Sequence, residues 1–412
     1  MPVSSPLPGL VAGIALLIAA PARASIDLDT AVRLALAQQP RLEAQAARAR
    51  AADARSVAAG ALPDPEFIAG LQNLSVEQPD PYAADAERMT MTEVGIMQAF
   101  PNAARRHQLE RSARLDAARI EAEQALLQRA VVRDVSLAWI DVWQAQEALT
   151  VVERLAVETA RTREAGLIAQ RSGRGSQDAT LAAELANGLV DDRRRALGQA
   201  LVSARARLVR WTGHEADAVT GNPPTAMPAS LEAALARAGE HPELQALERA
   251  AERSGAEVDL ARAAYRPDWR LQAMYGHRRP YDDMFSVQVG IDLPLFTARR
   301  QDPALAAASA ERLAAQADAE DGRRALLAEL QAAWGEQTLV DQRLEHFETR
   351  LLPAARLRVD SALAAYGGGR GTLDAVFDAR LQALDIELQT LDLRAARARL
   401  RTQLRYLTGD DA

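Results

Sequence analysis

The side chains that could carry out chemistry are few and scattered in this sequence. It contains no Cys, which excludes thiol catalysis, disulfide bonds and Cys-ligated metals. The five His stand at positions 107, 214, 241, 277 and 346, and no two have the close spacing of a metal-ligand pair. Walker A and GxGxxG motifs are also missing. We therefore find no catalytic or metal site and expect neither enzymatic activity nor a cofactor.

The remaining candidates are acids and arginines beside two glycine-rich turns, Gly173-Arg174-Gly175-Ser176 and Gly369-Arg370-Gly371-Thr372. The hydroxyl residue that closes each turn is suited to cap the helix that follows it. Asp178 and Asp374 then lie near the positive ends of those helices. Helix capping explains the two acids at least as well as a functional role does, so both interpretations stay open.

Long helical runs lead into and out of each turn, over about 103–171 and 176–212 in the first half and about 303–366 and 372–408 in the second. The first run would be roughly 100 Å long at 1.5 Å per residue. Pro353 should kink its helix locally. Apolar residues recur at steps of three and four, which is typical of a coiled-coil seam. They are Leu127, Val131, Val135, Ala138, Val142, Ala145, Leu149 and Val152, then Leu344, Phe347, Leu351, Ala355, Val359, Ala362 and Tyr366.

The two halves of the chain repeat each other. Leu28-Asp29-Thr30-Ala31 matches Leu231-Glu232-Ala233-Ala234, and Val94-Gly95-Ile96 matches Val289-Gly290-Ile291. Each half reads as a short helix, a longer helix, two strands and a long helix pair. The sequence thus predicts two structural repeats, 25–227 and 228–412.

Two strands are expected in each repeat, over about 65–74 and 90–100, then about 268–276 and 285–295. From Phe285 to Leu293 the odd positions are apolar and the even ones are polar or Gly. Strands of this length with one apolar face suit a transmembrane β-barrel. An ordinary amphipathic hairpin on a soluble core is the alternative. Aromatic residues at the inner strand ends favour the membrane, as in an interfacial girdle; they are Phe67, Phe100, Trp269 and Phe296.

Four strands cannot close a barrel, because the smallest have about eight, so several copies of the chain would have to share one. The polar positions Ser286, Gln288 and Asp292 would then face a water-filled lumen. We expect a mainly α fold with a small β part, in which a long helical coiled-coil barrel continues into a transmembrane β-barrel shared between protomers.

The N-terminus and the overall charge bear on the compartment. Residues 1–24 resemble a signal peptide, with an apolar stretch from Leu10 to Ala20 and a small-x-small cleavage site at Ala22-Arg23-Ala24. The protein is thus expected to be exported, and without Cys it cannot be a lipoprotein. Its net charge of −7 gives no reason to expect nucleic-acid binding.

Several loose motifs together resemble the TolC-like outer membrane efflux proteins over essentially the whole mature chain. The motifs are residues 289–296 (VGIDLPLF), Leu352-Pro353-Ala354, residues 373–379 (LDAVFDA) and Tyr406-Leu407-Thr408-Gly409. Within that family, residues 98–106 are similar to the turn of the CzcC/CusC-type heavy-metal branch, with Ala-Arg in place of its usual Gly-Lys.

The resemblance implies a homotrimer in the outer membrane of a Gram-negative bacterium, with a large periplasmic part. It implies a passive duct that meets a periplasmic adaptor (a membrane fusion protein) and an inner-membrane pump, of the RND type. The docking turns would be Gly173, Gly175 and Ser176 with Gly369, Gly371 and Thr372, and the gate at the tip would use Tyr366, Arg370, Asp374 and Asp378, with Arg174 and Asp178.

The cargo stays open between heavy-metal cations, drugs or other small molecules, and polypeptides secreted by the type I route. Acids brought together by threefold symmetry would favour cations at the tip. An exported coiled-coil scaffold without a pore is the alternative of another class, and it would share the long helices and the repeat.

Overall fold

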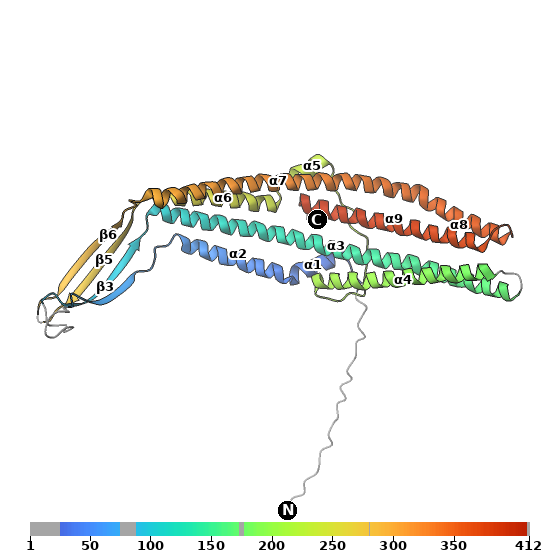
Figure 1. The fold of residues 1–412 in the computed structure, drawn as a ribbon, viewed down its shortest axis with the longest axis horizontal. Coiled ribbons are helices and arrows are strands. Elements are labelled where there is room, and N and C mark those ends of the chain that lie inside the picture. Colours follow the sequence, from blue (N-terminus) through green and yellow to red (C-terminus); the bar gives the residue numbers. More distant parts are fainter. Residues whose placement is uncertain (1–24, 75–87, 173–176, 280, 410–412) are drawn as a thin grey trace, which may run out of the picture. The chain divides into compact units, whose positions relative to one another are not determined.

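The protein is mainly helical with a small β part, as expected. The structure, a computed structural model, describes residues 25–74, 88–172, 177–279 and 281–409 (Figure 1). The expected signal peptide, residues 1–24, lies outside the described residues. None of the described helices is both long and apolar enough to cross a membrane.

The described elements follow the order of the predicted repeat. Each half has a short helix, a longer helix, two strands and long helices. In chain order they are β1 (Ser25–Ile26), α1 (Leu28–Gln38), α2 (Pro40–Ala59), β2 (Glu66–Gln72), β3 (Met91–Phe100), α3 (Ala103–Arg171), α4 (Gln177–Thr212), β4 (Ala218–Val219), α5 (Leu231–Ala238), α6 (Pro242–Ala263), β5 (Asp268–His277), β6 (Met284–Asp292), the 3-10 turn η1 (Thr297–Arg299), α7 (Gln301–His346), the π-helical turn η2 (Phe347–Leu351), α8 (Leu352–Gly367) and α9 (Leu373–Thr408).

The chain forms two compact units. One comprises the residues up to 34 with 138–223 and 354–391, and the other comprises 35–137, 224–353 and 392–412. These units differ from the two sequence repeats, because α3 and α9 each run through both units and every unit takes segments from both repeats.

The four longer strands form one antiparallel sheet in the order β2-β3-β5-β6. Its register pairs Phe100 with Trp269 and Trp269 with Ile291, so these side chains share a face. β6 ends at Asp292 rather than at the expected 295, because Pro294 has no N–H for a ladder bond. Phe296 therefore lies beyond the strand, which corrects its predicted place at a strand end.

The unit that contains the sheet has its core where α5, α6, α7 and α9 meet. Eight buried residues form this core: Ala234, Ala238, Leu244, Leu326, Leu330, Ala333, Leu404 and Leu407. His241 is buried beside them at the start of α6. Its Nε2 lies 3.2 Å from the carbonyl oxygen of Tyr406, and its Nδ1 accepts a hydrogen bond from the backbone N–H of Glu243 (3.4 Å). A neutral ring satisfies both contacts, since one nitrogen donates and the other accepts.

In the other unit, α3, α4 and α9 pack through two apolar clusters. The first contains Ala148, Val152, Leu155, Val190, Leu384, Leu388 and Leu391, and the second contains Ala183, Ala186, Leu373 and Phe377. A short parallel pair, β1 with β4, lies in the same unit. The indole N–H of the buried Trp139 on α3 donates to the carbonyl oxygen of Ile26 in β1 (3.1 Å). This bond ties the start of the described chain to the middle of the long helix.

The predicted seam of the first half is confirmed over most of its length. Six of its residues are buried: Val131, Val135, Ala138, Val142, Ala145 and Val152. The seam of the second half is buried at Leu344 and Ala355 but ends at an exposed Tyr366. Next to Pro353, where a kink was expected, the helix contains the π-helical turn η2 directly before α8. Proline removes one helical hydrogen bond, and a π turn is a usual way for a helix to absorb that loss.

We expect acid to destabilise the unit that contains His241. Burial, followed by the positive charge of Arg129, lowers the pKa of His241 from 6.5 to about 4. The unfolded chain therefore binds this proton near pH 6.5 and the folded chain only near pH 4. Stability is fully present above pH 6.5 and falls as the pH drops towards 4, by about 3 kcal/mol in total.

The measurement is the apparent Tm of the purified protein in detergent from pH 7.5 to 4. His241→Asn keeps an N-cap acceptor and removes the titration, so its Tm should fall less steeply with acid. His346→Asn, at an exposed site on α7, is the control and should follow the wild type. Equal slopes for His241→Asn and the wild type would contradict the assignment.

Candidate functional site

The turn between α8 and α9 has a defined glycine-dependent geometry. Gly369 adopts a positive φ of 69°. The N–H of Arg370 donates to the carbonyl oxygen of Ala365 (2.9 Å), and the N–H of Gly369 donates to that of Tyr366 (3.0 Å). These two bonds form a Schellman motif, in which the left-handed residue is usually Gly because a Cβ would be strained there. The turn is therefore a fixed loop end on which side chains can be presented.

The start of α9 is capped by Thr372 rather than by an acid. The backbone N–H of Ala375 donates to Thr372 Oγ1 (3.3 Å), which is the contact of an N-cap residue. Asp374 lies in the first turn of α9, and its Oδ1 is buried without a hydrogen-bond partner among the described residues. Asp378 is one turn further on and exposed. Thr372 thus takes the capping role that was open for Asp374, and Asp374 is free for another one.

The structure does not join the predicted gate residues to each other within one chain. Tyr366 is 43% exposed, and Arg370 and Asp378 are also exposed. Among the described residues, no side-chain hydrogen bond or ion pair links these three or Asp374. In the first repeat, Gly173, Arg174, Gly175 and Ser176 lie outside the described residues, and Asp178 is exposed in the first turn of α4. The four described second-repeat residues therefore form no gate bond with one another within the described part of the chain.

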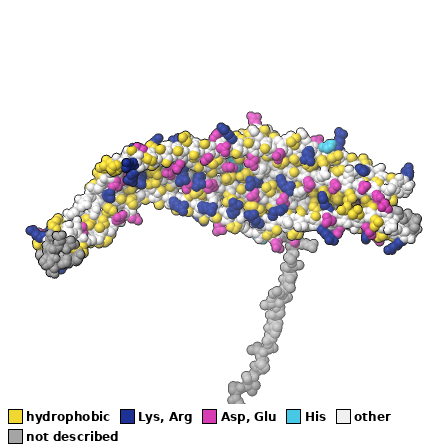
Figure 2. All heavy atoms as spheres, viewed as in Figure 1, with side chains coloured by type: hydrophobic (Ala, Val, Ile, Leu, Met, Phe, Trp, Pro, Cys, Tyr) yellow, Lys and Arg dark blue, Asp and Glu magenta, His cyan; other side chains and the backbone are white. Residues whose placement is uncertain are grey.

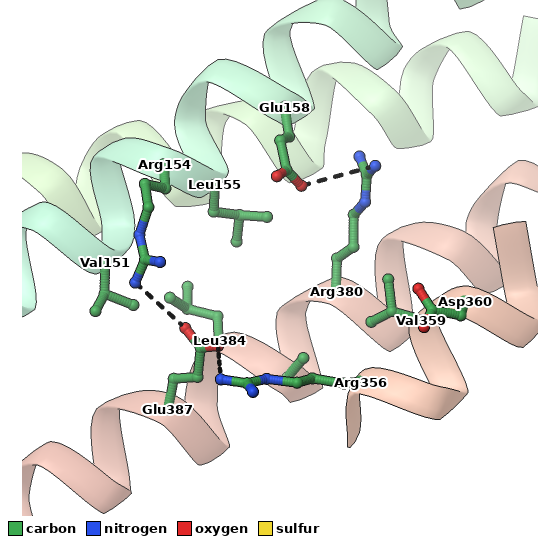
Figure 3. A pocket seen from close by; sticks show the side chains of 11 residues that line it. Val151, Arg154, Leu155, Glu158, Arg356, Val359, Asp360, Arg380, Leu384 and Glu387 are labelled. Atoms are coloured by element: carbon green, nitrogen blue, oxygen red, sulfur yellow. Dashed lines mark ion pairs between the residues drawn. The ribbon is translucent and has the colours of Figure 1, made fainter. Parts of the chain in front are cut away.

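A charged pocket of about 250 Å³ lies between α3, α8 and α9 of the same unit (Figure 3). Glu387 is within 3.9 Å of Arg154 and 3.8 Å of Arg356, and Glu158 is 3.7 Å from Arg380. Apolar side chains complete its lining: Val151, Leu155, Val359, Ala383 and Leu384. Ion pairs around this pocket thus join α9 to α3 and to α8 across an apolar floor.

Arg380 is the pocket residue that sequence reasoning missed. Its side chain is only 13% exposed, and its Nη1 donates to Thr162 Oγ1 (2.9 Å) while its Nε is buried without a partner. Its place becomes clear from the burial of its neighbours in α9. The buried apolar residues of α9 at 373, 377, 384, 388 and 391 leave one seam position vacant, and that position is 380. A charged residue inside an apolar seam is known to set helix register at a cost in stability.

The predicted lumen positions on β6 share one face of the sheet. Ser286, Gln288, Gly290 and Asp292 alternate with apolar residues, and their partners on β5 include Arg270, Gln272 and Met274. Arg270 forms an ion pair with Asp292. Gly290 allows this approach, because a Cβ there would lie 2.8 Å from Arg270 Cγ. The face therefore carries polar groups that suit contact with water.

Comparisons with known proteins agree with this architecture. Residues 232–410 match the family model described as Outer membrane efflux protein. No curated protein sequence matches the chain significantly. The solved structure of CusC is 17% identical, with a TM-score of 0.78 over 92% of this chain and 91% of that one.

Two further solved structures share the fold. The outer membrane protein VceC from Vibrio cholerae is 18% identical, with a TM-score of 0.78 over 93% of this chain and 96% of that one. The open state of the MtrE outer membrane channel from Neisseria gonorrhoeae is 18% identical, with a TM-score of 0.76 over 93% and 88%. The second half of this chain is thus similar to the outer membrane efflux proteins in sequence, and the chain as a whole shares the fold of these channels.

Proposed function

We propose that this protein is the outer membrane channel of a tripartite efflux system, which passively conducts substrates from a periplasmic adaptor and an inner-membrane pump to the exterior. The observation that carries the proposal is one continuous apolar face of the sheet, exposed on all four strands. Its large exposed members are Phe67, Leu71, Val94, Ile96, Phe100, Trp269, Leu271, Tyr275, Phe285, Val287, Val289 and Ile291. A face of this size is costly in water and is suited to contact lipid.

The sheet also needs partners at its edges. β2 and β6 each have a neighbour on one side only among the described strands, which leaves a row of backbone donors and acceptors open. We propose that three copies pair these edges into a twelve-stranded barrel. The polar face with Ser286, Gln288 and Asp292 would then line the lumen, and the apolar face would contact outer membrane lipid.

The tip turns are our candidates for the adaptor contact. The Schellman turn with Gly369 and Gly371 and the cap Thr372 would present a rigid docking surface, together with Gly173, Gly175 and Ser176 of the first repeat. Between copies, Tyr366, Arg370 and Asp378 are exposed and thus accessible for gate contacts. We propose that an RND-type pump selects the cargo, with heavy-metal cations as the first candidate and drugs, other small molecules or secreted polypeptides as the alternatives.

A charge on the apolar face should block insertion, and a charge on the polar face should not. Val289→Arg and Gln288→Arg change neighbouring residues of β6 that point to opposite faces. Arg near the middle of the lipid-facing band costs about 2–4 kcal/mol. We expect Val289→Arg to reduce the amount of protein in separated outer membranes severalfold.

Gln288→Arg is the matched control and should insert normally while altering conductance in planar bilayers. Equal insertion of both variants without any conductance would count against the channel and favour the scaffold without a pore.

The acids of the α9 start should control cation block of the channel. Threefold symmetry would bring three copies of Asp374 and of Asp378 together, and carboxylate rings attract cations. We expect Asp374→Asn with Asp378→Asn to raise the divalent-cation concentration for half-block in planar bilayers roughly tenfold, which corresponds to about 1.4 kcal/mol. Asp360→Asn, at an exposed site on α8, is the control. An unchanged half-block concentration in the double variant would remove these acids from the gate.

A further inference from the structure

The same tripeptide, Ala-Arg-Arg, follows the last strand of each repeat. It stands at residues 104–106 after β3 and at residues 298–300 after β6. Figure 2 shows basic side chains gathered beside hydrophobic ones where the sheet meets α7. The two copies of the motif are used differently, and the difference points to a ligand.

In the first repeat Arg105 is bound by the fold, while the Nε of Arg106 is buried without a hydrogen-bond partner among the described residues. Arg105 Nη1 donates to Asp268 Oδ2 (2.9 Å), and Asn102 donates its backbone N–H to the same carboxylate (2.7 Å). In the second repeat, neither Arg299 nor Arg300 has a side-chain hydrogen bond or ion pair with any residue that the structure describes. Arg266, just before β5, is equally without a described side-chain partner. The second repeat therefore keeps guanidinium groups that nothing in the described chain neutralises.

Arg266 and Arg300 line one cavity of about 1010 Å³ at the inner end of β6. Gln301 also lines it, and its Oε1 is buried without a donor among the described residues. α7 begins at this point without a side-chain cap, so its positive end adds to the field. The cavity thus offers two cationic groups and one unused hydrogen-bond acceptor.

The acids that line this cavity do not cancel the two arginines. Asp268 is paired with Arg105, Asp292 with Arg270, and Glu257 lies 4.0 Å from Arg253. Glu311 lies on α7 eleven residues after Arg300, which is about 16 Å along the helix axis. The uncompensated charge next to the strand end is therefore positive.

Apolar side chains surround the same cavity on the strand side. Ile291, Leu293 and Pro294 line it, and the following Leu295 and Phe296 are each 73% exposed. Leu293 continues the alternation of the apolar sheet face. A ligand that fits both parts has an anionic head and an apolar tail. A free phosphate ion would leave the apolar part unused.

We propose that this cavity binds an anionic phospholipid that carries hydroxyl groups on its head, in the leaflet that faces the periplasm. Arg266 and Arg300 contact the phosphate, since guanidinium groups recognise phosphate through paired N–H donors. A headgroup hydroxyl donates to Gln301 Oε1, and the acyl chains follow Ile291, Leu293 and Leu295. The inference rests on the proposed function, because that function places the inner end of β6 at the membrane surface.

The test uses the full chain, extracted in mild detergent and exchanged into nanodiscs of phosphatidylglycerol or of phosphatidylcholine. Phosphatidylcholine has the phosphate, but its headgroup has no hydroxyl and carries a cancelling charge. Native mass spectrometry counts the lipids retained per assembly. We expect the wild type to retain phosphatidylglycerol and to lose phosphatidylcholine. Excess inorganic phosphate should leave the bound phosphatidylglycerol in place.

Arg266→Gln with Arg300→Gln should weaken phosphatidylglycerol retention roughly 25-fold, at about fivefold for each basic group near the membrane surface. Arg312→Gln changes another exposed arginine of α7 without a described side-chain partner, and should retain lipid as the wild type does. The mass of the protein assembly should stay the same in both variants, which separates lipid loss from misfolding.

Three results would overturn the inference: equal retention of the two lipids, retention that the double variant keeps, or displacement by inorganic phosphate. Assemblies in the outer membrane that retain no lipid here would mean that a second copy fills the cavity, and only this inference would fail. Absence of the wild type from the outer membrane would instead refute the proposed function.

Discussion

The rest of this structure depends on a sheet that one chain leaves incomplete. Its four strands expose an apolar face across their full width, and β2 and β6 leave their outer backbone groups without a strand partner among the described residues. Water would form hydrogen bonds with the strand edges but would leave the apolar face exposed to solvent. Lipid would cover the apolar face but would leave the backbone groups of the edges without hydrogen bonds. Pairing between copies inside a membrane meets both demands. The proposed channel, with its shared barrel, is such an arrangement.

The periodic parts of the fold could be predicted from the sequence. The alternation of apolar and polar residues from Phe285 predicted the position of β6. Apolar residues at steps of three and four predicted the seam of α3, which is buried from Val131 to Val152. Both patterns are local, since each follows directly from the geometry of a strand or a helix. β6 ends earlier in the sequence than predicted. The apolar residues beyond Pro294 continue the alternating pattern, although the backbone can no longer pair there.

Contacts without a period could not be predicted in the same way. β1 and β4 have two residues each, too few for any alternation, and their paired residues are 193 positions apart in sequence, as Ser25 and Ala218 are (218 − 25 = 193). The bond from Trp139 to Ile26 depends on this pairing. Pro353 predicted a kink, but it did not predict that the helix would contain a π turn over Phe347–Leu351. Such features depend on tertiary packing, which a single sequence does not display.

In the candidate site, too, the local features could be predicted from the sequence and the tertiary contacts could not. Gly369 and Thr372 have the local roles that their residue types indicate, in a turn and a cap. Arg380 was hidden because charges on long helices are usually solvated, and only the burial of its seam neighbours shows that it faces α3. Tyr366, Arg370 and Asp378 are exposed in one chain. Whether they form a gate depends on contacts beyond the described residues of one chain.

The central claim is that copies of this chain share one barrel in the outer membrane. Its most direct test is the mass of the protein in mild detergent, measured by light scattering on material extracted from separated outer membranes. The account predicts three chains per particle in that fraction. A monomer recovered from the soluble periplasmic fraction would contradict it, because the apolar face and both edges of the sheet would then have no partner.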